Sequence, residues 1–137
     1  MIPVERVFLD ANVLFSAARS PASRLRRLWT LADTQLLTSG LALEKARRNL
    51  ALDRPSALDE LDTLARLIAI VSEPEPGALL PPGMQLPDKD RPIFLAAVAA
   101  TANYFVTGDK KHFGAYRGEN FGGVIILTPS EFFDARE

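Results

Sequence analysis

The sequence predicts an α/β protein in which a mostly parallel sheet is covered by helices on both faces. Short apolar runs that predict strands alternate along the chain with longer segments of helical spacing. The strands, such as Val7-Phe8-Leu9, are continuous apolar runs, which is typical of parallel strands buried on both faces. No repeat or low-complexity tract interrupts this order, and we expect residues 1–137 to form a single domain.

The first half of the chain supplies two strands and three helices. The run before Asp10 indicates a buried strand that ends in a turn. Apolar residues after Pro21 recur at i, i+3, i+4 and i+7 and leave an arginine-rich outer face. Asp53-Arg54-Pro55 separates the next two helices. The expected elements are a strand at 7–9, a helix at 21–32, a strand at 35–39 and helices at 41–52 and 56–70.

The second half begins with a loop and continues with alternating helices and strands. Residues 73–87 hold five prolines and two glycines, which predicts a connecting loop. Asp90 suits the N-cap of an alanine-rich helix that tolerates Pro92 in its first turn. The remaining elements are that helix to about Ala102, a strand at 104–107, a short helix at 111–116, a strand at 124–127 and a terminal helix from Pro129.

Composition restricts the chemistry that the chain can perform. No apolar run is long enough to cross a bilayer and no signal peptide is recognisable, so we expect a cytoplasmic protein without membrane contact. The chain has no cysteine and one histidine, His112, which excludes thiolate chemistry and leaves oxygen ligands for any metal site. The net charge of -1 argues against a polyanionic partner, but residues 1–54 hold nine Lys and Arg against five Asp and Glu. Bound cations would make the surface more basic than this formal charge.

Four acidic residues lie at the ends of elements that a parallel topology brings to one edge of the sheet. Asp10 and Asp109 follow strands, Glu44 lies near the start of a helix, and Asp90 begins another. Converging carboxylates repel one another unless a cation binds, and Mg²⁺ and Mn²⁺ prefer oxygen ligands. One or two such ions would activate water and stabilise the leaving oxygen in phosphodiester hydrolysis.

Each of these residues also has a purely structural interpretation. Asp10 and Asp90 suit caps, Asp109 suits a turn after Gly108, and Glu44 suits a surface ion pair with Arg47 or Arg48. Asn12 either orients Asp10 or caps the next helix. Lys110, Lys111 and His112 form a solvated loop or contact phosphate, and the helix faces with Arg24, Arg26, Arg27, Arg47 and Arg48 are solvated or steer a polyanion.

Four segments together resemble one family over nearly the whole chain. They are FLDANVLFSA at 8–17, ALEKARRNL at 42–50, PDKDRPIFLAAVAATANYFVTGDKKHFG at 87–114 and GVIILTPSEF at 123–132. They resemble the PIN-domain family, the PilT N-terminus-like nucleases that include VapC-type toxins. The resemblance implies a three-layer α/β/α sandwich with an acidic site that binds Mg²⁺ or Mn²⁺ and cuts single-stranded RNA.

The resemblance also implies roles for individual residues. Asp10, Glu44, Asp90 and Asp109 match the four catalytic, metal-binding acids of the family, with Asp88 competing with Asp90 for its position. Thr107 and Asn12 match supporting polar residues. His112 stands where many relatives have a further acid, which puts a second metal ion in question. Family members commonly form homodimers, and the toxins among them are held inactive by a small antitoxin protein.

The leading hypothesis is therefore a Mg²⁺- or Mn²⁺-dependent endoribonuclease, the toxin of a toxin–antitoxin pair. The alternative is a catalytically weak PIN-fold module that acts by binding protein or RNA. A doubly wound phosphatase or a receiver domain fits poorly. Asn12 stands where such phosphatases place a second acid, and the last strand leads into Thr128-Pro129 where receiver domains carry a lysine.

Overall fold

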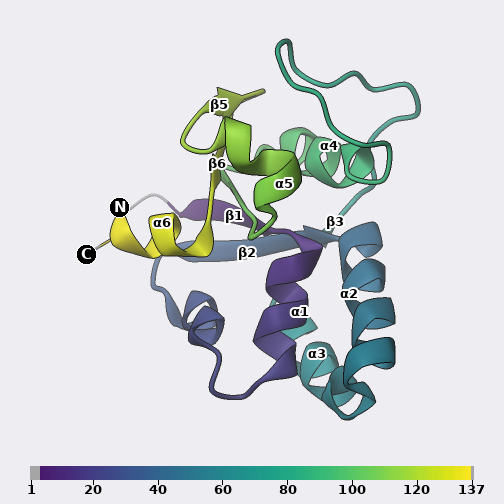
Figure 1. Cartoon of the computed structure of the whole chain (residues 1–137). Helices are drawn as coiled ribbons and strands as arrows, with labels where there is room; N and C mark the ends of the chain where they lie inside the picture. Colours follow the sequence, from purple (N-terminus) through teal and green to yellow (C-terminus); the bar gives the residue numbers. More distant parts are fainter. Residues whose placement is uncertain (1–3, 137) are drawn as a thin grey trace.

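The computed structural model describes residues 4–136 and has the predicted mixed α/β architecture (Figure 1). Its α-helices and strands are β1 (Glu5–Leu9), α1 (Ala11–Arg19), β2 (Thr34–Ser39), α2 (Gly40–Asp53), α3 (Leu58–Ala65), β3 (Ala69–Val71), α4 (Arg91–Ala99), β4 (Tyr104–Val106), α5 (Lys110–Phe113), β5 (Asn120–Phe121), β6 (Val124–Leu127) and α6 (Pro129–Asp134). Short 3₁₀ helices are η1 (Arg24–Thr30), η2 (Pro55–Ala57) and η3 (Gly114–Tyr116).

One six-stranded sheet organises the fold, with strand order β3-β2-β1-β4-β6-β5. All neighbouring strands are parallel except β5 and β6, which form an antiparallel pair at one edge. Helices α1, α2 and α3 lie on one side of the sheet and α4 and α5 on the other (Figure 1). This arrangement is the predicted three-layer sandwich.

Two apolar cores fill the space between the layers. Along β1, Val7 and Leu9 are fully buried in the core beneath α1 and α3, whereas Phe8 is fully buried in the core beneath α4. Phe8 stacks on Phe105 of β4 with ring centroids 5.5 Å apart. Because successive strand residues point to opposite faces and both faces are covered, Val7, Phe8 and Leu9 are all apolar although they face different cores.

The segment after β1 differs from the prediction. Residues 11–19 form α1, a helix absent from the expected elements, and the helix expected at 21–32 is the shorter 3₁₀ helix η1. The side chain of Arg26 explains part of this arrangement, because its Nε donates to the Ala17 carbonyl at 2.8 Å and so satisfies the open end of α1. The expected arginine-rich face is thus partly used to cap a neighbouring helix.

Two short edge strands were also absent from the prediction. The helix expected to reach about Ile70 ends at Ala65, where i to i+3 hydrogen bonds tighten the last turn, and Ala69–Val71 then forms β3. Asn120–Phe121 forms β5. The proline-rich loop is confirmed, since residues 72–90 contain no helix or strand.

The strand register places two polar residues side by side at the carboxyl edge of the sheet. Leu9 of β1 pairs with Val106 of β4, so the next residues, Asp10 and Thr107, are also adjacent. The Asp10 N–H continues the ladder by donating to the Val106 carbonyl at 3.1 Å. Both side chains are buried, at 5% and 2% exposure.

Candidate metal centre

A hydrogen-bond network joins Asp10 to the end of β4. Asp10 Oδ2 accepts from the Thr107 hydroxyl at 2.8 Å and from Asn12 Nδ2 at 3.1 Å, and its Oδ1 accepts from the Ala11 N–H at 2.8 Å. The Thr107 hydroxyl in turn accepts from the Asp109 N–H at 3.0 Å, and Asn12 Oδ1 accepts from the Gly108 N–H at 2.8 Å. The network fixes the position of both strand-end acids relative to one another.

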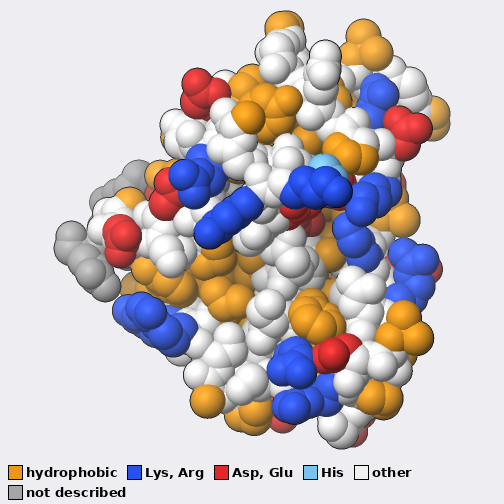
Figure 2. Space-filling view, viewed as in Figure 1, with side chains coloured by type: hydrophobic (Ala, Val, Ile, Leu, Met, Phe, Trp, Pro, Cys, Tyr) orange, Lys and Arg blue, Asp and Glu red, His pale blue; other side chains and the backbone are white. Residues whose placement is uncertain are grey.

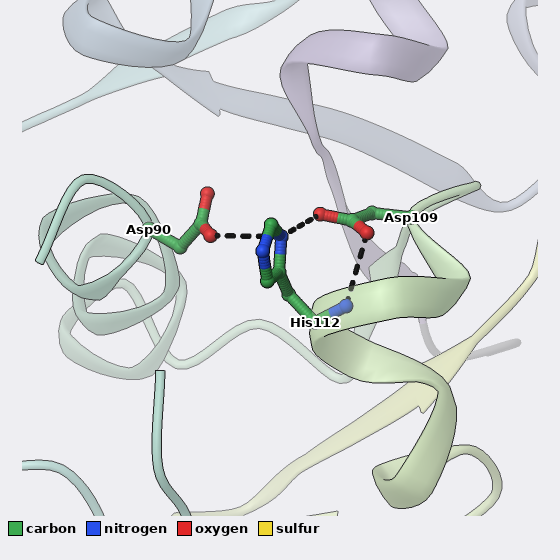
Figure 3. A group of neighbouring side chains, drawn as sticks. All are labelled: Asp90, Asp109 and His112. Carbon is green, nitrogen blue, oxygen red and sulfur yellow. Dashed lines mark hydrogen bonds and ion pairs between the residues drawn. The ribbon is translucent and has the colours of Figure 1, made fainter. Parts of the chain in front are cut away.

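A second group of side chains lies between α4 and α5 (Figure 3). His112 Nδ1 is 2.7 Å from Asp109 Oδ2 and 3.3 Å from Asp90 Oδ2. A nitrogen placed between two carboxylate oxygens must carry a hydrogen, and Asp109 at the shorter distance accepts it. The Asp109 carboxylate also accepts from the His112 N–H at 3.1 Å.

Asp90 is the acid whose surroundings are incomplete. It is 3% exposed, and its Oδ2 has no hydrogen-bond partner among the described residues. A buried carboxylate oxygen without a donor is costly, and a bound cation would offset that cost. Its Oδ1 lies 3.6 Å from Lys45 Nζ on α2. The two oxygens of Asp90 therefore face different surroundings.

The pKa values of two acids are displaced in opposite directions. Burial raises the pKa of Asp10 above its usual value and outweighs the hydrogen bonds from Thr107 and Ala11 and the charge of Lys45, which lower it. Burial alone would also raise the pKa of Asp109, but the hydrogen bonds and charge of His112 lower it by more. His112 thus favours the charged form of Asp109, whereas burial disfavours the charged form of Asp10.

The donors in this region fit a divalent cation. One ligand atom from each of Asp90, Asp109 and His112 lies within 4.8 Å of the others. Neighbouring ligands of an octahedral Mg²⁺ lie about 3 Å apart, since each is about 2.1 Å from the ion. The two carboxylates suit Mn²⁺ or Mg²⁺, and the unpartnered Asp90 Oδ2 is the oxygen that a cation would satisfy. His112 would bind the ion only through a ring nitrogen that carries no hydrogen.

Comparison with known proteins identifies the family. The sequence profile of the PIN domain matches residues 6–111 of the chain. The chain belongs to the PIN-domain family. PIN domains are generally nucleases. The family resemblance found in the sequence is therefore confirmed.

The chain was also compared with curated proteins and with solved structures. No curated protein matches the sequence of this PIN domain. Among solved structures, it is similar to a chain in the crystal structure of VapBC2 from Rickettsia felis bound to a DNA fragment from their promoter. The TM-score is 0.64 and the sequence identity 16%, over 90% of this chain and 98% of the other. At that identity the similarity concerns the fold.

The structure does not bring Glu44 of the PIN domain into this group. Glu44 is exposed on α2, and it is the next residue, Lys45, that points toward Asp90. Helix α2 packs through Ala42, Ala46 and Leu50. At 100° per residue, Glu44 lies about 160° around the helix from Ala46, on the opposite side from the sheet. A role for Glu44 therefore stays a prediction from the family resemblance, and Lys45 is the α2 residue that the structure adds to this region.

The other predicted residues lie at varied distances from the group. Asn12 and Thr107 contact Asp10 directly, as expected of supporting residues. Asp88 is fully exposed and its carboxylate lies 3.9 Å from Arg91, so the loop presents Asp90 and not Asp88 to the group. His112, expected to contact phosphate or to belong to a solvated loop, instead points inward at two acids.

The basic side chains form the surroundings of the centre. Lys110, Lys111 and Arg48 are exposed, and Arg47 pairs with Asp62 at 2.7 Å. Figure 2 shows Lys and Arg side chains gathered around the histidine on this face of the molecule. Beside the acids is a pocket of about 400 Å³, lined by Asn12, Val13, Ser16, Leu25, Lys45, Gly108, Asp109 and Pro129.

Within residues 4–136, no helix combines the length and the apolar character needed to span a bilayer.

Proposed function

We propose that this PIN domain is a metal-dependent endoribonuclease that hydrolyses phosphodiester bonds of single-stranded RNA. The buried Asp90 Oδ2, which has no hydrogen-bond partner among the described residues and lies beside Asp109 and His112, carries the proposal. Membership of a family whose members are generally nucleases supports it. Lys and Arg side chains around the histidine (Figure 2) supply positive charge for a polyanionic substrate.

The proposed roles follow from the contacts of each residue. Asp90, Asp109 and His112 would hold Mg²⁺ or Mn²⁺, which when bound would activate water and stabilise the leaving oxygen. Asp10, kept in place by Thr107 and Asn12, adds negative charge to the same region. Exposed Lys110 and Lys111 lie at the start of α5, beside Asp109, where they contact the phosphates of the RNA.

Cleavage of single-stranded RNA with added Mn²⁺ tests the proposal. Asp90→Asn and Asp10→Asn should each lower the cleavage rate by about 100-fold or more, as should a chelator. Asp59→Asn, which makes the same change at an exposed residue of α3, is the matched control and should cleave at the wild-type rate. Equal cleavage by the wild type, both site variants and the chelated protein would refute the metal-dependent mechanism.

A second candidate is a catalytically weak module that acts by binding protein or RNA. The ammonium of Lys45, 3.6 Å from Asp90, and the imidazole between two acids favour it, because both already offset part of the negative charge. Calorimetry separates the two candidates. A nuclease of the proposed kind binds Mn²⁺ at millimolar concentration, whereas a module with a neutralised site does not.

We also propose the toxin role, with a small antitoxin as partner, for a single domain that acts as a homodimer in the cytoplasm. The fold that this chain shares with a chain of the VapBC2 structure supports the toxin role. Growth of a bacterial host during induced expression tests it. Wild-type protein should arrest growth and Asp90→Asn should not. Arrest by both proteins would separate toxicity from the proposed site.

A further inference from the structure

Lys45 lies deeper in the acidic centre than a surface lysine. Its side chain is 31% exposed, its Nζ lies 3.6 Å from Asp90 Oδ1, and it lines the same pocket as Asn12 and Asp109. The other oxygen of Asp90 faces His112 and has no hydrogen-bond partner among residues 4–136. Asp90 Oδ1 therefore lies near the Lys45 ammonium, and Asp90 Oδ2 is available to coordinate a metal cation.

The charges of the side chains in the centre indicate how many divalent cations it can hold. Asp10, Asp90 and Asp109 contribute three negative charges when ionised, and Lys45 contributes one positive charge. The His112 imidazole contributes none, because an imidazole that binds a metal ion is neutral. The remainder of two negative charges is neutralised by one divalent cation. A second divalent cation on the Asp90 Oδ1 side would lie next to the ammonium, and two like charges at such a distance repel strongly in a partly buried site.

We propose that the Lys45 ammonium takes the place of a second divalent cation, so that this PIN domain binds one such ion per chain, between Asp90, Asp109 and His112. This inference rests on the proposed metal-dependent function. It concerns the number of ions and the role of Lys45, neither of which follows from membership of the family.

Mn²⁺ titration of the metal-free protein tests the inference without reference to activity. Calorimetry gives the number of ions and their affinity, and electron paramagnetic resonance of free Mn²⁺ gives an independent count. The variants are Lys45→Met, which removes the charge at similar length, and Lys45→Glu, which reverses it. Lys89→Met is the matched control, because Lys89 is exposed in the loop before Asp90.

The expected results differ between the variants. The wild type and Lys89→Met should each bind one Mn²⁺ with the same affinity. Lys45→Met should bind Mn²⁺ about tenfold more tightly, since a positive charge near the ion is removed. Lys45→Glu should bind two ions. Circular dichroism of every variant checks that it is folded, and Lys45→Met decides the question alone if Lys45→Glu does not fold.

Two outcomes would overturn the inference, and a third concerns the proposed function. Two Mn²⁺ ions per wild-type chain, or equal affinity in Lys45→Met and Lys89→Met, would show that the ammonium does not replace an ion. No binding of Mn²⁺ to the wild type or to any variant would refute the metal-dependent function itself, and the inference with it.

Discussion

Replacing Thr107 with valine tests whether one hydroxyl group connects the two strand-end acids. This hydroxyl donates to Asp10 Oδ2 at 2.8 Å and accepts from the Asp109 N–H at 3.0 Å. Valine has nearly the same volume but offers neither contact. The variant therefore leaves a buried carboxylate with one donor fewer and a backbone N–H without its acceptor.

The size of the effect can be worked out from these contacts. A hydrogen bond to a charged group contributes about 1.5–3 kcal/mol, and a buried donor left without a partner costs about 1–3 kcal/mol. Because Asp109 is only partly buried, water compensates some of the second loss. We expect Thr107→Val to lower the free energy of unfolding by about 2–4 kcal/mol. Thr107→Ser keeps the hydroxyl and loses one buried methyl group, for about 1 kcal/mol.

Urea unfolding of the metal-free proteins at neutral pH measures both variants. The difference between them should shrink at acidic pH. Burial raises the folded-state pKa of Asp10 above its usual value, so this carboxyl takes up a proton in the folded protein before it does so in the unfolded chain as the pH falls. Stabilities of the valine and serine variants within about 0.5 kcal/mol of each other at pH 7 would refute the role of the hydroxyl.

Three further predictions concern other parts of the chain. Gly122→Ala should lower stability in urea by about 1 kcal/mol or more beyond Gly77→Ala. Both glycines have positive φ, but a Cβ at Gly122 would lie 3.1 Å from Pro81, whereas a Cβ at Gly77 would meet no atom within 4 Å. Equal losses of stability in the two variants would contradict this steric explanation. The Thr128 N–H lowers the pKa of Glu131 below 4.5, so Glu131 stabilises the folded state above that pH and loses this contribution as pH falls through the folded-state pKa. In thermal unfolding, the wild type should be more stable than Glu131→Gln at pH 7, and this difference should disappear by pH 3. A difference that stays constant over this range would contradict the stabilising role of the Glu131 carboxylate. Glu44→Gln should cleave RNA at the wild-type rate, and a loss of about tenfold would return Glu44 to the site.

The central strands were predictable because burial on both faces leaves a clear pattern. The β1 run is apolar at every position from Val7 to Leu9, and Asp10 marks its end. The edge strands carry no such pattern, since β3 has three residues and Ile70 is half exposed. Helix α1 was missed because it lacks a charged face: Arg19 at its end is its one charged residue.

The candidate site was predictable to the extent that topology determines it. Parallel strands bring Asp10 and Asp109 to one edge, and the N-terminus of α4 brings Asp90 to the same place. Which side of α2 faces that edge depends on helix packing, and an acid next to a lysine in sequence does not reveal it. The inward position of His112 depends on the single turn of α5, which no periodic pattern specifies.

The hydrogen bond between Thr107 and Asp10 spans 97 residues of sequence, and this has a consequence for the protein while it is being made. Ribosomes add about 5–20 residues per second, so about 5–20 s pass between the synthesis of the two residues. Until β4 emerges, β1 lacks a neighbour on that side, and Asp10 has neither its hydroxyl donor nor the other acids. The cluster of acids is therefore assembled only after β4 has been made, and the proposed cleavage of RNA could begin only from that point.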